Sequence, residues 1–112
     1  MILRNKDQQI ERCWGRTDQT PALHVQLSSQ EEYLFPYIHL SHAHLIKETD
    51  NNIQHLTIHF NNFTVSITGE QLKEIVLNLQ KQTLEWVKVS KLKPNTKSRS
   101  LIITSIEVES TN

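Results

Sequence analysis

The chain has 112 residues, and its twelve basic and twelve acidic side chains cancel. That length predicts a single domain, and the absence of net charge argues against a global field that would draw the chain to nucleic acid or to an anionic membrane. Cys13 is the only cysteine, which excludes an internal disulfide and a thiolate metal cage and fits a reducing compartment. No apolar run reaches membrane-spanning length, so we expect a cytoplasmic protein without membrane contact.

Residues 1–20 are interpreted as an N-terminal arm and residues 21–112 as one domain. Cys13 and Trp14 belong to a stretch with helical spacing, but Gly15 and the polar run after it interrupt that spacing. A short helix, an edge strand and a disordered arm all remain open for this segment. Trp14 is the side chain with enough area to dock the arm onto the domain.

From residue 22 the pattern becomes that of β-structure. Leu23, Val25 and Leu27 alternate with polar residues, which is typical of a half-buried strand. Residues 32–46 are rich in aromatic and aliphatic side chains, and Pro36 interrupts them. Because proline cannot donate a hydrogen bond to a sheet, Pro36 indicates either a break between two strands or an edge position.

A hairpin is predicted over residues 53–68. Asn61 and Asn62 separate two alternating segments, and asparagine tolerates the positive φ that a two-residue turn requires. With the turn there, the cross-strand pairs all place their apolar side chains on one face: Phe60 with Phe63, Ile58 with Val65, and Leu56 with Ile67.

One long helix is predicted over about residues 69–82. Thr68 and Gln71 have the spacing of a pair that caps the first turn reciprocally. The apolar residues that follow have the i, i+3, i+4, i+7 spacing of one buried helix face: Leu72, Ile75, Val76 and Leu79. Alternation returns at residues 84–89 and again at 101–108. The expected fold is therefore α+β, an antiparallel sheet of about 5–7 strands with this helix packed on one face.

Six histidines are the most unusual feature of the composition: His24, His39, His42, His44, His55 and His59. If residues 38–46 pair antiparallel with 53–60 and the apolar residues share the core face, the last four lie together on the opposite face. One register places His42 across from His59, about 5 Å apart at Cβ, and the neighbouring register pairs His44 with His55. Either pair is close enough to share a metal ion.

The stronger arguments oppose a metal site on this face. His55 and His59 are about 13 Å apart along one strand, so both cannot bind the same ion. No carboxylate or cysteine is evident on the face, and the helical spacing of two ligands one turn apart is absent. The favoured interpretation is a solvated polar face, and we expect no cofactor.

A basic segment follows the predicted strand at 84–89. All its charged residues are positive: Lys88, Lys91, Lys93, Lys97 and Arg99. Such a segment can bind a nucleic-acid backbone or another anion without reading sequence, with Trp86 as a stacking platform. The competing interpretations are a solvated loop and a tryptophan that belongs to the core.

The last strand begins with apolar residues on both faces and therefore needs cover on both. The arm or a second copy of the chain can supply that cover, so we expect the interface residues to be Trp14, Leu101, Ile102 and Ile103. No catalytic motif is present, and the two glycines leave little scope for a phosphate loop. The sequence favours a non-catalytic binding or assembly module, monomeric or homodimeric, with nucleic-acid association or a histidine metal site as alternatives.

Overall fold

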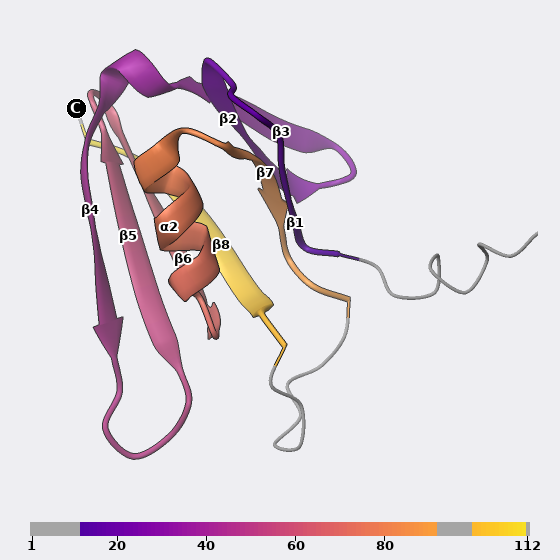
Figure 1. Ribbon diagram of the computed structural model, residues 1–112, viewed down its shortest axis with the longest axis vertical. Helices are drawn as coiled ribbons and strands as arrows, with labels where there is room; N and C mark the ends of the chain where they lie inside the picture. Colours follow the sequence, from indigo (N-terminus) through magenta and orange to yellow (C-terminus); the bar gives the residue numbers. More distant parts are fainter. Residues whose placement is uncertain (1–11, 92–99, 112) are drawn as a thin grey trace, which may run out of the picture.

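The computed structural model describes residues 12–91 and 100–111. Within these residues the chain forms eight strands in two sheets and one α-helix, together with a short 3₁₀ helix. The α+β class is confirmed at this level. The expected single sheet of about 5–7 strands is wrong, because the strands divide into two sheets of four (Figure 1).

The first sheet contains strands from both ends of the described chain. In spatial order it consists of β1 (Trp14–Arg16), β7 (Leu84–Lys88), β2 (Ala22–Ser28) and β3 (Glu31–Pro36). β2 and β7 are parallel, and the other neighbours are antiparallel. Part of the segment interpreted as an arm therefore belongs to this sheet: β1 is an edge strand, and Cys13 before it is buried.

The second sheet is antiparallel throughout. In spatial order it consists of β4 (Leu40–Lys47), β5 (Gln54–Phe60), β6 (Phe63–Glu70) and β8 (Ile102–Ser110). The hairpin prediction is confirmed, since Ile58 pairs with Val65 and Leu56 pairs with Ile67. Its turn differs from the prediction, because neither Asn61 nor Asn62 has a positive φ.

A short connection carries the chain from the first sheet to the second. Pro36 ends β3 in an extended conformation, and the 3₁₀ helix η1 (Tyr37–His39) follows at once. The Tyr37 hydroxyl donates a 2.7 Å hydrogen bond to the Leu84 carbonyl oxygen of the first sheet. Burial of this phenol raises its pKa. Pro36 thus marks a change of sheet as well as a break between strands.

The core lies between the two sheets. Leu23 and Val25 of the first sheet and Ile58 and Val65 of the second have no exposed surface, and they belong to one apolar cluster. Each sheet has an apolar face that must be covered. One short helix would not cover both faces, and the two sheets cover each other.

Helix α2 (Lys73–Lys81) is shorter than predicted. β6 continues to Glu70, and Thr68 pairs within the sheet instead of capping the helix. Gln71 turns the chain with a φ of 57°. The backbone N–H of Leu72 then donates a hydrogen bond to the side-chain oxygen of Gln54 from β5. The predicted apolar stripe is nevertheless the buried one, since Ile75 and Leu79 of the helix and Leu72 just before it belong to the core.

Candidate functional site

An aromatic pocket opens where the first sheet meets the second. Its volume is about 270 Å³. Residues of β3, of η1 and of the β5–β6 turn line it: Tyr33, Leu34, Phe35, Pro36, His39, Phe60, Asn61, Asn62 and Phe63. Four aromatic rings, an imidazole and two amides in one concave site are the composition expected of a ligand pocket, with apolar walls and a few polar groups.

The four rings contact one another across the two sheets. Phe35 of β3 stacks on Phe60 of β5, with ring centroids 4.7 Å apart, and it meets Phe63 of β6 edge-on at 5.7 Å. Tyr33 stacks beside Phe35 at 5.6 Å. Phe35 and Phe60 are buried. Rings held in offset-stacked and edge-to-face arrangements support one another, so the pocket has fixed walls.

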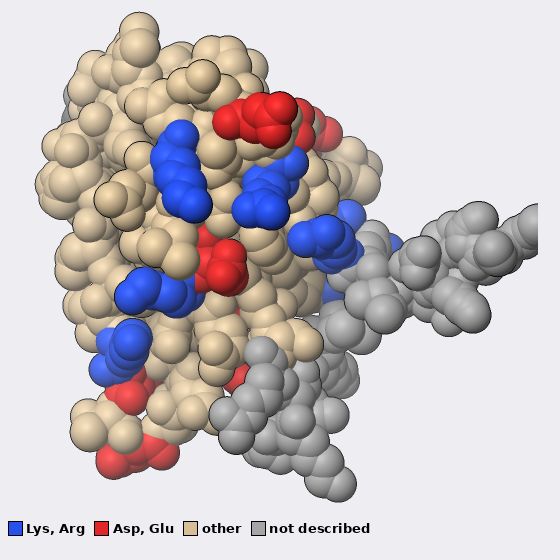
Figure 2. All heavy atoms as spheres, viewed as in Figure 1, with Lys and Arg blue, Asp and Glu red and all other residues tan. Residues whose placement is uncertain are grey.

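The pocket has exposed apolar side chains and little charge around it. Leu34 is 66% exposed and Ile38 is 87% exposed. No lysine, arginine, aspartate or glutamate belongs to the lining. In the view of Figure 2 no charged side chain, blue or red, is visible on the surface over η1. At the edge of the pocket the Glu31 carboxylate accepts a 3.4 Å hydrogen bond from the Tyr33 hydroxyl.

Sequence reasoning missed this pocket. It assigned Phe60 and Phe63 to the hairpin's apolar face, and it interpreted Pro36 as a strand break or an edge position without inferring a pocket beside it. The signal that could have found it is the spacing of Tyr33 and Phe35, which puts two rings on one face of a strand next to the turn of chain at Pro36.

The histidine face is where the sequence placed it. His42 pairs with His59, which is one of the two registers considered, and their rings stack with centroids 4.3 Å apart. His44 lies opposite Thr57, so the alternative pairing of His44 with His55 does not occur. His24 and His39 lie elsewhere, on β2 and in η1.

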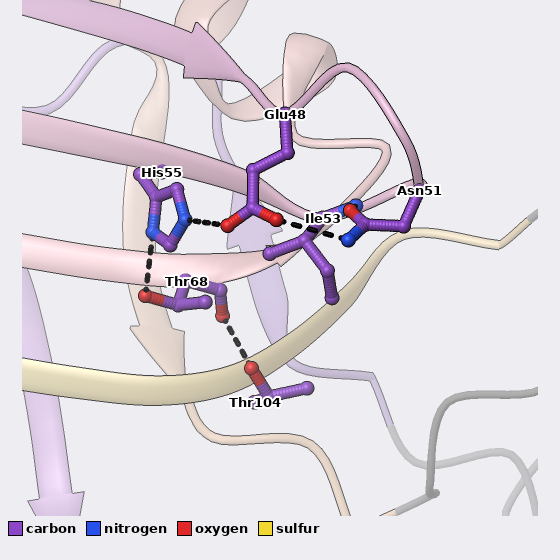
Figure 3. Close-up of polar contacts among 6 residues, drawn as sticks. All are labelled: Glu48, Asn51, Ile53, His55, Thr68 and Thr104. Atoms are coloured by element: carbon purple, nitrogen blue, oxygen red, sulfur yellow. Dashed lines mark hydrogen bonds and ion pairs between the residues drawn. The ribbon is translucent and has the colours of Figure 1, made fainter.

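His55 belongs to a small polar network (Figure 3). Its Nε2 donates to Glu48 at 2.7 Å, and the Thr68 hydroxyl lies 3.3 Å from its Nδ1. Asn51 donates a further hydrogen bond to Glu48. The bonds from His55, and then from Asn51, lower the pKa of the Glu48 carboxyl. A carboxylate from the β4–β5 loop thus reaches this face, which the sequence pattern did not indicate.

This arrangement favours a solvated face over a metal centre. Among the described residues, no group of three or more histidine, cysteine, aspartate or glutamate side chains is placed to hold a metal ion. The stacked rings of His42 and His59 are only 18° from parallel. Because the lone pair of an imidazole nitrogen lies in its ring plane, two parallel rings do not direct their lone pairs at one point.

Two residues of the basic segment lie within the described chain. Lys88 and Lys91 line a second pocket of about 260 Å³ together with Gln26, Leu27, Ser28, Ser29 and Val89. Lys93, Lys97 and Arg99 lie outside the described residues. The Lys88 ammonium also lies 5.7 Å from the centre of the Trp86 ring system.

The proposed interface residues are mostly covered within the chain. Ile102 and Ile103 are 3% and 0% exposed, and Leu101 and Trp14 are half-buried against the core. Ser90 bonds to both backbone groups of Ile103, so it covers the start of β8. An interface on this strand would therefore use the edge over residues 104–110.

Comparison with models of protein families, with curated proteins and with solved structures finds no match for this chain. Among the described residues, no helix is long and apolar enough to cross a membrane.

Proposed function

We propose that the chain is a non-catalytic binding module whose ligand is an extended peptide segment of a partner protein. The segment lies along edge strand β3 and inserts one apolar side chain into the aromatic pocket. The single observation that carries this proposal is the pocket's position. Its packed rings lie at the end of β3, which among the described residues has a hydrogen-bonded neighbour on one side only.

The two parts of the site act together in this proposal. An edge strand offers unpaired backbone groups, which bind an extended chain regardless of its sequence, and an adjacent pocket selects a side chain. His39, Asn61 and Asn62 are exposed at the rim, where they can bond to the peptide backbone. Tyr33 and the phenylalanines provide the apolar contact, and rigid aromatic walls lose little entropy on binding.

The charge beside the pocket defines the peptide further. Glu31 and Glu32 at the start of β3 are both exposed. Glu32 accepts a hydrogen bond from His24, whereas Glu31 accepts one from the Tyr33 hydroxyl at the pocket. We therefore expect the peptide to carry a lysine or arginine near its apolar residue, because a cation there pairs with Glu31.

A second copy of the chain is a less suitable ligand. The edge strand β8 carries Glu107 and Glu109. Charged side chains on an edge strand oppose its pairing with another copy, since like charges across strands repel. We expect light scattering at tens of micromolar to give the mass of a monomer. A dimer that competes with peptide binding would contradict the proposal.

The test is selection of binders from a random-peptide display library on the immobilised protein. We expect enriched sequences that share an apolar residue close to a lysine or arginine. A chemically synthesised consensus peptide is then titrated against two matched variants, Leu34→Ala and Ile46→Ala. Both residues are exposed aliphatic side chains on edge strands, at 66% and 53%, but only Leu34 lines the pocket.

Leu34→Ala should weaken binding by about tenfold, which is the loss of one partly buried leucine contact, and Ile46→Ala should leave binding unchanged. Neither change should affect folding, because exposed substitutions usually alter stability by less than about 0.5 kcal/mol. Equal affinity for both variants, or a library that yields no shared sequence, would refute the proposal.

A further inference from the structure

The outer face of the first sheet carries an aromatic platform beside a cationic pocket. Trp86 of β7 lies between Gly15 of β1 and His24 of β2 in the strand register. A Cβ built on Gly15 would lie 2.1 Å from the indole Nε1, so the indole occupies the space above a strand that has no side chain there. The backbone of β1 thus supports the ring from beneath.

The cationic pocket begins one register step further along the same strands. Lys88 faces the same side as Trp86, and its neighbour on β2 is Gln26. Lys88 and Lys91 line the pocket with the hydroxyls of Ser28 and Ser29. Two ammonium groups, two hydroxyls and an amide are donors that suit a phosphate oxygen.

From this juxtaposition we propose that the outer face of the first sheet binds a nucleotide unit, with its base stacked on Trp86 and its phosphate between Lys88 and Lys91. The spacing of platform and pocket along one strand matches the way single-stranded nucleic acids are bound, by stacking of bases and neutralisation of the backbone. A free nucleotide and a single-stranded nucleic acid both carry a base and a phosphate. The competition experiment below distinguishes these two ligands.

Lys88 connects the two parts of the site. In the structure its ammonium lies over the Trp86 ring system, 5.7 Å from the centre, in a cation–π contact. A base that stacks on the indole replaces this ammonium, and the long flexible side chain can then turn to the phosphate. The same residue fills the platform when it is empty and pairs with the ligand when it is occupied.

The carboxylates near the site do not prevent this. Glu32 lies across from Gln26 on β3, and it is bonded by His24, 2.5 Å away. Glu85 is exposed on β7 and has no counterpart in the β1 register. Glu31 lies opposite Ser28 and therefore borders this pocket as well as the proposed peptide site. The aromatic pocket and the cationic pocket nevertheless share no lining residue.

The probe is a fluorescein-labelled oligothymidylate of about twelve nucleotides, which is within the usual site size for such surfaces. Fluorescence anisotropy is measured across a range of salt concentrations on wild type and variants. Trp86→Leu should weaken binding by about tenfold or more, the value of one stacked base, and Trp86→Phe should restore most of that loss because it keeps a ring.

The lysines are tested by salt dependence. Each phosphate contact on a single strand contributes about 0.7 to the slope of log K against log salt. Lys88→Ala and Lys91→Ala should each reduce the slope by about that amount, and the control Lys73→Ala on α2 should leave it unchanged. If the slope of log K against log salt is the same in all variants, the phosphate does not bind between Lys88 and Lys91.

Competition then identifies the source of the ligand. Displacement by adenosine monophosphate with the same dependence on Trp86 supports a free nucleotide, and displacement only by unlabelled single strand supports a nucleic acid. Displacement by polyphosphate with no effect of Trp86→Leu would overturn the stacking, as would equal affinity for a duplex, whose bases are already stacked.

Discussion

The two sheets have the same number of strands, but their outward faces differ in chemistry. On the second sheet the outward rows are mostly polar, as in the row from His42 through His59 and Thr64 to Glu109. Ile46, opposite His55, is the exposed aliphatic side chain on this face. On the first sheet the corresponding row runs from Gly15 through Trp86 and His24 to Leu34. One face offers mainly imidazoles and hydroxyls to water, and the other presents an indole next to an exposed leucine.

This difference indicates where recognition is to be sought. Histidines attract attention in the sequence, but in the structure four of the six already contact neighbours. His42 and His59 stack on each other, His55 bonds to Glu48 and Thr68, and His24 bonds to Glu32. The first sheet carries the exposed Leu34, the half-buried Trp86 and the cationic pocket, and with η1 and the β5–β6 turn it forms the aromatic pocket. Both proposed sites therefore depend on the first sheet.

The largest effect is expected in the second sheet, at Gly69. A Cβ there would lie 2.0 Å from the Ile102 carbonyl oxygen, at the bulge where β6 meets β8. A backbone atom within a paired strand cannot move without breaking the pairing. Gly69→Ala should therefore destabilise the fold by about 3 kcal/mol, the upper end for overpacking, measured by urea denaturation. A loss below about 1 kcal/mol would show that β8 is not held tightly at this point.

An intermediate effect is expected at the junction of the two sheets. Tyr37→Phe removes the hydrogen bond to Leu84 and leaves a buried carbonyl without it, which should cost about 1–3 kcal/mol.

The pH dependence of this residue has a definite sign. Burial raises the pKa of the folded phenol above the value of about 10 in the unfolded chain. The stabilisation is therefore complete below about pH 10 and is lost as the pH rises above it toward the raised pKa. Thermal melts between pH 8 and pH 11, both rough bounds around that value, should show a smaller loss of stability in Tyr37→Phe than in wild type. Parallel losses in both proteins would assign the alkaline transition to other groups.

The smallest of these effects is expected in the first sheet, at Gly15. The added methyl group would meet the Trp86 side chain, which can swing outward, so Gly15→Ala should cost only about 1 kcal/mol. The displaced indole should be more exposed to water, with a red-shifted emission in a background where Trp14 is replaced by phenylalanine. A cost equal to that of Gly69→Ala would contradict the difference between the two glycines.

Sequence reasoning succeeded where the determining contacts are local. Alternation on either side of Asn61 was enough to predict which residues pair in the hairpin and which face holds the histidines. It also gave the register of His42 with His59 as one of two choices. A period of two fixes the face of each side chain, and the burial of one face then limits the register.

It failed where the contacts are distant in sequence. The start of α2 was misplaced because Thr68 pairs within the sheet, and the chain before the helix is held by Gln54 on another strand, whose side-chain oxygen accepts from the Leu72 N–H. For Trp86 the sequence left a stacking platform and a place in the core as alternatives. The register shift at Glu85 puts Trp86 outside, while Leu84 and Val87 are both fully buried. A bulge and a parallel pairing depend on partners that no local pattern reveals.

The most direct test of the account is to map peptide binding by ¹H–¹⁵N correlation spectra of the labelled protein, titrated with the selected consensus peptide. The account predicts that the perturbed amides cluster in residues 31–39 and 60–63, around the aromatic pocket and along β3. Perturbations centred on the histidine face of β4 and β5, or on the edge of β8, would contradict it.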